Sequence, residues 1–287
     1  MLEITPEIQR LIDRALEEDQ AFADATTRAL IDPSIQAVGE FRAEEEGILA
    51  GISASLAVFK SLRPSAETRT LVEDGSRLVP GQLIATVSTS ADAILRGERL
   101  ALNVLQRMSG IATQTADYVK AVEGTGARII DTRKTAPGLR TLDKYAVRVG
   151  GGHNHRMHLG DGILIKDNHL YLLDREAIKL AQLIRRARQR APHTLKIEVE
   201  VTNLNQLEEA LEGRADIVLL DNMSIEDMAE AVRITGGRAL LEASGGITID
   251  NVAAVGDTGV DLISVGALTH SVKALDISMD ISSVRHP

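Results

Sequence analysis

Apolar residues near the start of the chain recur with helical spacing. Pro6 suits the first turn of a helix, where its missing N–H costs nothing. The apolar positions that fall on one stripe are Ile4, Ile8, Leu11, Ile12, Ala15 and Leu16. The pattern therefore predicts an amphipathic helix that buries one face.

The next segments alternate in a way typical of short strands. Residues 37–52 and 78–90 are β-like, and Pro80-Gly81 marks a turn between two of the pieces. Residues 91–122 then show a long helical pattern. Glycine is costly inside a helix, so we expect an interruption at Ser109-Gly110.

From about residue 127 short apolar strands alternate with helical stretches. The predicted strands are 127–131, 162–166, 196–201, 216–221, 238–246 and 261–266, and the clearest predicted helices are 170–190 and 224–235. Such alternation indicates parallel strands joined by crossover connections. The stretch has no GxGxxG loop of the dinucleotide-binding type, which favours an α/β barrel over an open doubly wound sheet.

Composition narrows the class of protein. The 287 residues carry a net charge of −9 and only 2% aromatic residues, which argues against nucleic-acid binding. The chain has no cysteine, so disulfides, thiolate metal sites and a cysteine nucleophile are excluded. The first residues lack a signal-peptide pattern, and no apolar run reaches the roughly 18 residues of a membrane span. We expect a soluble, cytoplasmic protein.

Charged residues gather where the predicted parallel strands end. The cations are Arg133, Lys134, Arg156 and Lys166, and the acids are Glu200 and Asp221. The C-terminal ends of barrel strands carry the chemistry, so these groups are predicted to converge. Taken singly, each is most simply a solvated loop residue. Two like charges ~5 Å apart repel by roughly 3 kcal/mol at an effective dielectric of ~20, so four together indicate a polyanionic ligand.

Small residues after the last two predicted strands suggest what that anion is. "EASGGIT" and "SVGALTHS" place glycine directly after a strand, where the backbone can approach a phosphate group. Two roles for Glu200 and Asp221 remain open. They could coordinate Mg²⁺ that accompanies pyrophosphate, or they could bind sugar hydroxyls and stabilise positive charge on a sugar ring.

Several motifs together resemble one known family. They are "ERLALNVLQRMSGIAT", "DTRKTAPGLRTLDKYAVRVGGGHNHR", "LIKDNH", "IEVEV", "LLDN", "EASGGI" and "VGALTHS". In this order and spacing they look like quinolinate phosphoribosyltransferase, and the similarity runs from about residue 10 to 282. The segment "EDQAFADATT" departs from the family pattern at Ala23, where glycine is usual. The molybdenum-operon homologues share the fold, but the intact "TRKT", "NHR" and "IKDNH" favour the quinolinate branch.

The resemblance implies a type II phosphoribosyltransferase fold. Residues 1–111 would form an N-terminal α/β sandwich, and residues 112–274 an incomplete, about seven-stranded parallel α/β barrel. Residues 275–287 would return to the N-terminal domain. The resemblance also implies a homodimer, sometimes assembled further, with each active site at the subunit interface.

The resemblance further implies roles for individual residues. Arg99, Arg133, Lys134, His155 and Arg156 would hold the substrate carboxylates, and Lys134 and Lys166 would face phosphoribosyl pyrophosphate. Glu200 and Asp221 would act on the ribose and Mg²⁺, directly or through water or substrate, and with the two lysines form the catalytic set. The remaining substrate-binding positions would be Thr132, Ser244, Gly245, Gly246, Gly266 and His270. Glu198 shares a strand face with Glu200, and we expect it to tolerate glutamine, because Glu200 lies nearer the strand's end.

The implied reaction transfers phosphoribosyl to quinolinate with loss of CO₂, giving nicotinate mononucleotide and pyrophosphate for NAD synthesis. Two other classes of function stay open at this point. One is a barrel aldolase that uses Lys134 or Lys166 as a Schiff base. The other is a non-catalytic sensor that binds both substrates and releases neither pyrophosphate nor CO₂.

Overall fold

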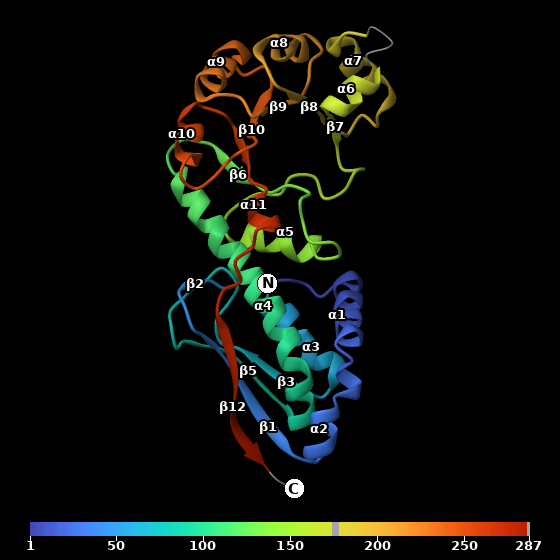
Figure 1. The fold of residues 1–287 in the computed structure, drawn as a ribbon, viewed down its shortest axis with the longest axis vertical. Helices are drawn as coiled ribbons and strands as arrows, with labels where there is room; N and C mark the ends of the chain where they lie inside the picture. Colours follow the sequence, from blue (N-terminus) through green and yellow to red (C-terminus); the bar gives the residue numbers. More distant parts are fainter. Residues whose placement is uncertain (174–177, 286–287) are drawn as a thin grey trace. The chain divides into compact units, whose positions relative to one another are not determined.

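The computed structural model describes residues 1–173 and 178–285 and comprises two compact units (Figure 1). The first unit contains Met1–Ala116, Thr135–Gly151 and Thr269–Pro287. The second contains Asp117–Lys134 and Gly152–Leu268. The chain thus passes from one unit to the other more than once, and each unit is built from segments that are distant in the sequence.

The first unit is built on a four-stranded antiparallel sheet in the order β12-β1-β5-β3. Its strands are β1 (Gln36–Ala43), β3 (Glu67–Thr70), β5 (Leu83–Ser90) and β12 (Ile277–Arg285). β1 alternates as the sequence pattern predicts, with Ala37, Phe41 and Ala43 buried on one face. β12 pairs with β1 at the edge, with Phe41 opposite Met279. The last strand of the chain therefore completes the sheet of the first unit.

Helices cover the buried face of this sheet (Figure 1). The helices of the unit are α1 (Pro6–Glu18), α2 (Ala25–Leu30), α3 (Ile52–Leu62), α5 (Arg140–Val149) and most of α4 (Ala91–Ala121), and the short elements are the 3-10 helix Ala21–Ala23, β2 (Gly47–Ile48) and β4 (Arg77–Leu78). The Thr5 hydroxyl caps α1 by accepting the Ile8 N–H at 3.3 Å. Ile8, Ile12 and Leu16 are buried, so the predicted amphipathic helix is confirmed.

The predicted interruption of the long helix at Ser109-Gly110 is wrong. α4 runs without a break from Ala91 to Ala121. The Ser109 hydroxyl is fully buried and bonds the backbone of Ala50, accepting from its N–H at 3.1 Å. A Cβ at residue 110 would collide with the carbonyl oxygen of Lys273. Glycine is here because another backbone segment touches the helix, and the tertiary contact outweighs the helix propensity.

The second unit is built on a six-stranded parallel sheet in the order β6-β11-β10-β9-β8-β7. Its strands are β6 (Arg128–Ile130), β7 (Ile163–Ile165), β8 (Ile197–Val201), β9 (Ile217–Asp221), β10 (Leu240–Ser244) and β11 (Leu262–Ser264). All six predicted strands are present. β6, the first of them in the chain, pairs with β11, the last, so the sheet curls back toward its own start. This is the topology of an α/β barrel.

The barrel is incomplete, as expected. His153 forms an isolated parallel bridge with Ile130 beside β6 and stands where a seventh strand would lie. Within the described ranges, no ladder joins this bridge to β7. The expected seven strands are therefore six strands and one bridge.

Helices follow most of the parallel strands and lie outside the sheet (Figure 1). They are α6 (Asp167–Leu173), α7 (Leu180–Arg190), α8 (Leu204–Glu212), α9 (Ile225–Thr235), α10 (Val252–Asp257) and, where the two units meet in the sequence, α11 (Ala267–His270). α8 and α9 begin at capping side chains, Asn203 and Ser224, which accept N–H groups of the first turn. The predicted helix 170–190 is two helices, and its residues 174–177 lie outside the described ranges. No helix in the described part of the chain is long and apolar enough to span a bilayer.

Candidate active site

A hollow of about 300 Å³ lies at the C-terminal ends of the parallel strands of the second unit, and we call it the mouth. Its lining residues are Thr132, Arg133, Lys134, His155, Arg156, Leu164, Lys166, Glu200, Leu219, Asp221, Glu242, Ser244 and Ser264. All four predicted cations and both predicted acids are among them. The convergence expected from parallel strands is therefore present in one cavity.

A buried aspartate sets the position of the first cations. Asp131 directly follows β6, is fully buried, and accepts the His155 N–H at 2.8 Å and the Asn154 side-chain amide at 2.6 Å. These bonds tie the 153–156 segment to the end of β6. The chain then turns outward, and the Thr132 hydroxyl accepts the Lys134 N–H at 3.0 Å. Asp131 is therefore a structural group that fixes the two cationic segments of the mouth relative to each other.

The arginines of the mouth lie close enough for their charges to interact, and in the part of the chain that the structure describes one of them has an unsatisfied donor. Within the described ranges, Nε of Arg133 is buried and has no hydrogen-bond acceptor. Burial lowers the pKa of the Arg156 guanidinium, and the nearby Arg133 charge lowers it further. A buried donor without an acceptor is costly, and a bound carboxylate or phosphate would relieve both that cost and the repulsion.

The acids of the mouth lie on neighbouring strands. Burial raises the pKa of the Glu200 carboxyl, while the Lys166 ammonium, 4.0 Å away, opposes the shift and Asp221 adds to it. Asp221 ends β9 and accepts the side-chain amide of Asn222 at 3.0 Å. Two carboxylates that repel each other at an open cavity form a hard oxygen donor set, which suits Mg²⁺.

The turn after β10 requires glycine because of its backbone conformation and the side chain packed against it. Ser244 lines the mouth, and Gly245 follows it with φ +89. A Cβ at residue 245 would collide with the side chain of Asn222. Only glycine fits here, and the turn therefore keeps small, backbone-exposed positions at 245 and 246 beside the mouth.

Five predicted site residues are not among the lining residues of the mouth: Gly245 and Gly246 of the turn described above, and Gly266, His270 and Arg99. Gly266 follows β11 and is half-buried, but it does not line the cavity. His270 is exposed, belongs to the first unit, and its Nδ1 lies 2.6 Å from the Ser271 hydroxyl. Arg99 also belongs to the first unit, where it lines a small hollow with Glu18, Asp19 and Asn103.

Two buried acids beneath the mouth were not predicted as site residues. Glu198 and Glu242 are 5% and 1% exposed, and their Oε2 atoms lie 3.2 Å and 3.7 Å from Nε2 of His155. Burial and, after it, the neighbouring Glu198 carboxylate raise the pKa of the Glu242 carboxyl to about 8, and His155 limits the shift. The period-two spacing with Glu200 and Ser244, which line the mouth, was the available signal that both side chains point inward.

These two acids separate the mouth from a second hollow of about 560 Å³. That hollow opens among residues that begin the strands, such as Arg128, Ile217 and Leu262. His155, Arg156 and Glu242 line both cavities, whereas Glu198 lines only the second. The interior of the barrel therefore contains a layer of ionisable groups between its two ends.

His155, Glu198 and Glu242 are also the described residues that could form a three-ligand metal cluster, with candidate atoms within 4.8 Å of one another. The histidine ring argues against that use. Its Nδ1 accepts the Arg156 N–H at 2.7 Å, so a metal on Nε2 would require a ring with no proton on either nitrogen. The cluster fits hydrogen bonding better than metal binding.

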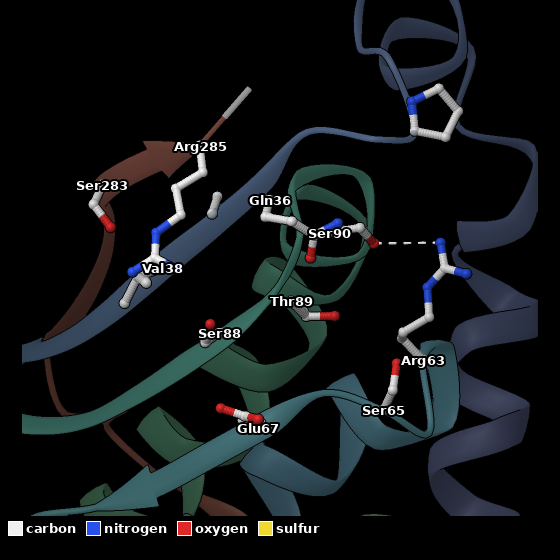
Figure 2. A pocket seen from close by; sticks show the side chains of 12 residues that line it. Gln36, Val38, Arg63, Ser65, Glu67, Ser88, Thr89, Ser90, Ser283 and Arg285 are labelled. Atoms are coloured by element: carbon white, nitrogen blue, oxygen red, sulfur yellow. Dashed lines mark hydrogen bonds between the residues drawn. The ribbon is translucent and has the colours of Figure 1, made fainter. Parts of the chain in front are cut away.

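The first unit has a hollow of its own at one end of the antiparallel sheet, with a volume of about 490 Å³. Figure 2 shows Arg63 and Arg285 on opposite sides of it, with Ser65, Ser88 and Thr89 between them. Arg63 donates to the Ser90 hydroxyl at 3.4 Å and lies 3.6 Å from Asp92. None of the predicted site residues lines this hollow.

Comparisons with known proteins point to one enzyme family over nearly the whole chain. Residues 24–109 match the N-terminal domain of quinolinate phosphoribosyl transferase, and residues 111–280 match its C-terminal domain. The chain is 45% identical over 276 residues to the nicotinate-nucleotide pyrophosphorylase [carboxylating] of Mycobacterium leprae, covering 94% of this chain and 95% of that protein. It is 41% identical over 277 residues to the probable enzyme of that name from Bacillus subtilis, covering 96% and 94%.

A solved structure agrees as well. The nicotinate-nucleotide pyrophosphorylase from Francisella tularensis superposes with a TM-score of 0.89 at 38% identity, covering 97% of this chain and 98% of that one. The match therefore includes both the antiparallel sheet domain and the incomplete barrel that carries the mouth. With both domains matched, this chain belongs to the quinolinate phosphoribosyl transferase family.

Proposed function

We propose that the mouth is where this chain transfers the phosphoribosyl group of 5-phosphoribosyl 1-pyrophosphate to quinolinate, with release of CO₂. The chain is an enzyme of the carboxylating nicotinate-nucleotide pyrophosphorylase family, a phosphoribosyltransferase of NAD biosynthesis. One observation carries the location of the reaction. The four predicted cations and the two predicted acids, from the ends of several strands, line a single cavity.

The cations bring two substrates together that would otherwise repel each other. Quinolinate carries two carboxylates, and Arg133 and Arg156 present planar guanidinium groups that suit them. Lys134 and Lys166 offer compact charges to the phosphates of the second substrate. Holding both anions in one cavity converts a bimolecular encounter into a positioned one.

The acids then act on the charge that develops during transfer. The pyridine nitrogen attacks the anomeric carbon, a C–N bond forms, and the C–O bond to pyrophosphate breaks with its electron pair leaving on pyrophosphate. Glu200 and Asp221 face this region and stabilise positive charge on the ribose ring. The pyridinium formed draws electrons, so the C–C bond to the adjacent carboxylate breaks, CO₂ leaves, and the ring carbon takes up a proton. The product is nicotinate mononucleotide.

We propose Mg²⁺ as the metal of the reaction. Glu200 and Asp221 would hold it, directly or through water or substrate, because they supply oxygen ligands at the edge of an open cavity. When bound, Mg²⁺ neutralises negative charge on the departing pyrophosphate. The chain's own part is to place the two carboxylates on neighbouring strands, so that both face the same space.

We further propose that the chain works as a homodimer in the cytoplasm. The family resemblance supports the dimer, with Arg99 of one chain serving the mouth of the other. A chain without cysteine suits a reducing compartment.

One assay separates this function from its alternatives. The purified protein is incubated with quinolinate, phosphoribosyl pyrophosphate and Mg²⁺, and pyrophosphate, CO₂ and nicotinate mononucleotide are measured together. Equal amounts of the three products support the proposal. Binding of both substrates without any product would identify a sensor, and borohydride trapping of a lysine with a carbonyl substrate would identify an aldolase.

A further inference from the structure

Both ring nitrogens of His155 face protein groups, which decides where the ring carries its proton. Nδ1 accepts the backbone N–H of Arg156 at 2.7 Å. A nitrogen that accepts a hydrogen bond carries no proton, so in the neutral ring the proton must sit on Nε2. The backbone contact alone therefore selects one tautomer.

The groups on the other side of the ring agree with that tautomer. Nε2 points into the barrel, 3.2 Å from the Glu198 carboxylate and 3.7 Å from the Glu242 carboxylate. The Glu198 carboxylate, at hydrogen-bond distance, accepts hydrogen bonds and so requires an N–H at this position. Both acids are more than nine-tenths buried, and within the described ranges the second oxygen of each has no hydrogen-bond partner. Both acids face His155, and Glu242 also interacts with Glu198 and Ser264.

The segment that carries His155 is held from its backbone as well. The His155 N–H donates to Asp131 at 2.8 Å, and the Arg156 guanidinium donates to the Gly162 carbonyl at 3.4 Å. The ring therefore links the buried acids to the backbone N–H of Arg156, whose side chain lines the mouth. A rotation of the ring would remove the partner of that backbone N–H and so loosen the segment that carries the arginine.

We propose that Glu198 and Glu242 are positioning residues, which hold His155 in its Nε2–H form and thereby set Arg156 at the mouth. The proposal deepens the proposed function and rests on it only where substrate is concerned.

The tautomer can be measured in the free protein, without substrate and without turnover. Nitrogen-15 NMR of histidine-labelled protein at pH 7 distinguishes the two neutral tautomers from the imidazolium, and the His155 signals are those that disappear in His155→Gln. We expect a neutral ring with its proton on Nε2. An imidazolium, or a proton on Nδ1, would overturn the proposal whatever reaction the chain catalyses.

Kinetics test whether the acids position Arg156. Glu198→Leu removes the acceptor while keeping an inward-pointing side chain, and we expect the quinolinate KM to rise about tenfold or more. The KM for phosphoribosyl pyrophosphate should change by less than about twofold. Glu198→Gln keeps a carbonyl acceptor, so the quinolinate KM should return to within about threefold of the wild-type value.

Glu209 provides the matched control. It is a half-buried carboxylate of the same unit that accepts the Leu180 N–H at 3.1 Å and lines neither end of the barrel. Glu209→Leu should lower the thermal midpoint without a selective change in either KM. If Glu198→Leu behaved like Glu209→Leu, the acids would be merely structural and the positioning role would be wrong. Loss of turnover in the wild type would instead refute the proposed function, and the NMR result would still stand.

Discussion

Each of the two sheets of this protein has a hollow lined by arginines, but only the hollow of the parallel sheet, the mouth, brings many charged side chains together. At the end of the antiparallel sheet, Gln36 begins a strand where Ser90 ends one, because neighbouring strands run in opposite directions. In the parallel sheet every strand ends on the same side, so each strand-helix unit contributes a loop to the mouth. Parallel topology therefore gathers residues that the sequence spaces far apart.

The arginines also differ in their partners. Arg63 in the first unit has the Asp92 carboxylate 3.6 Å away and donates to the Ser90 hydroxyl. In the described part of the chain, Nε of Arg133 at the mouth is buried without an acceptor. Arg63 has partners within its own chain, whereas the buried Arg133 donor has none among the described residues and is the one that we expect to bind the substrate. Substitution of an arginine in each hollow tests this difference.

The largest expected effect is at Arg133. We expect Arg133→Ala to weaken quinolinate binding by ~2–5 kcal/mol, because a desolvated carboxylate loses its partner, and to leave folding nearly unchanged. The matched variant Arg63→Ala should leave both KM values unchanged and alter the free energy of unfolding by at most about 1 kcal/mol. Steady-state kinetics and thermal melts measure both. Unchanged quinolinate kinetics in Arg133→Ala would contradict the assignment.

The acids of the mouth should affect turnover. Glu200→Gln and Asp221→Asn remove charge that faces the ribose and Mg²⁺, and we expect kcat to fall about 10²-fold at saturating Mg²⁺. Glu198→Gln, two residues away on the same strand face, should keep most of the activity because it preserves an acceptor for His155. If Glu198 proved essential to turnover and Glu200 dispensable, the two acids would have exchanged roles.

Neutralising a buried acid should have opposite effects on the stability of the protein in the two units. Asp92 is buried between Arg63 and Arg96, so Asp92→Asn should destabilise the protein by leaving two cations without their partner. Glu242 is buried beside another carboxylate, and its raised pKa means that the folded state keeps a proton which the unfolded chain loses above about pH 4.5. Wild-type stability should therefore fall as the pH rises from about 4.5 to about 8.

Urea unfolding across this pH range measures the effect of Glu242. The wild type should lose up to ~1.4 kcal/mol per pH unit relative to Glu242→Gln, which cannot ionise at this position. The two stability curves should run parallel above about pH 8. Parallel curves over the whole range would mean that Glu242 is ionised in the folded state.

The smallest expected effect comes from mixing subunits. Arg99→Ala and Lys166→Ala should each be nearly inactive alone. If Arg99 acts across a twofold axis, half of the dimers refolded from equal amounts are mixed, and each mixed dimer has one intact site. Activity should then recover to about a quarter of the wild-type value. If Arg99 serves its own chain, every site lacks one group and mixing recovers nothing.

The local sequence pattern was sufficient to predict many of the helices and strands of this protein. Short apolar runs between helical stretches located all six parallel strands, which are covered on both faces, and the 3.6-residue stripe located α1, which buries one face. The convergence of Arg133, Lys166 and Glu200 also followed from the sequence, since parallel strands must end on one side. The order and spacing of the motifs were specific enough to predict the family from the sequence alone.

Tertiary structure decided what depends on residues distant in the chain. α4 continues through Ser109-Gly110 because the backbone at Lys273 packs against it, and no local propensity contains that contact. Glu198 and Glu242 meet at His155 only because the sheet curls and brings β8, β10 and the 153–156 segment around one interior. The sequence determined which charges reach the mouth, while closure of the barrel decided which charges are buried beneath it, because burial depends on what other segments of the chain cover.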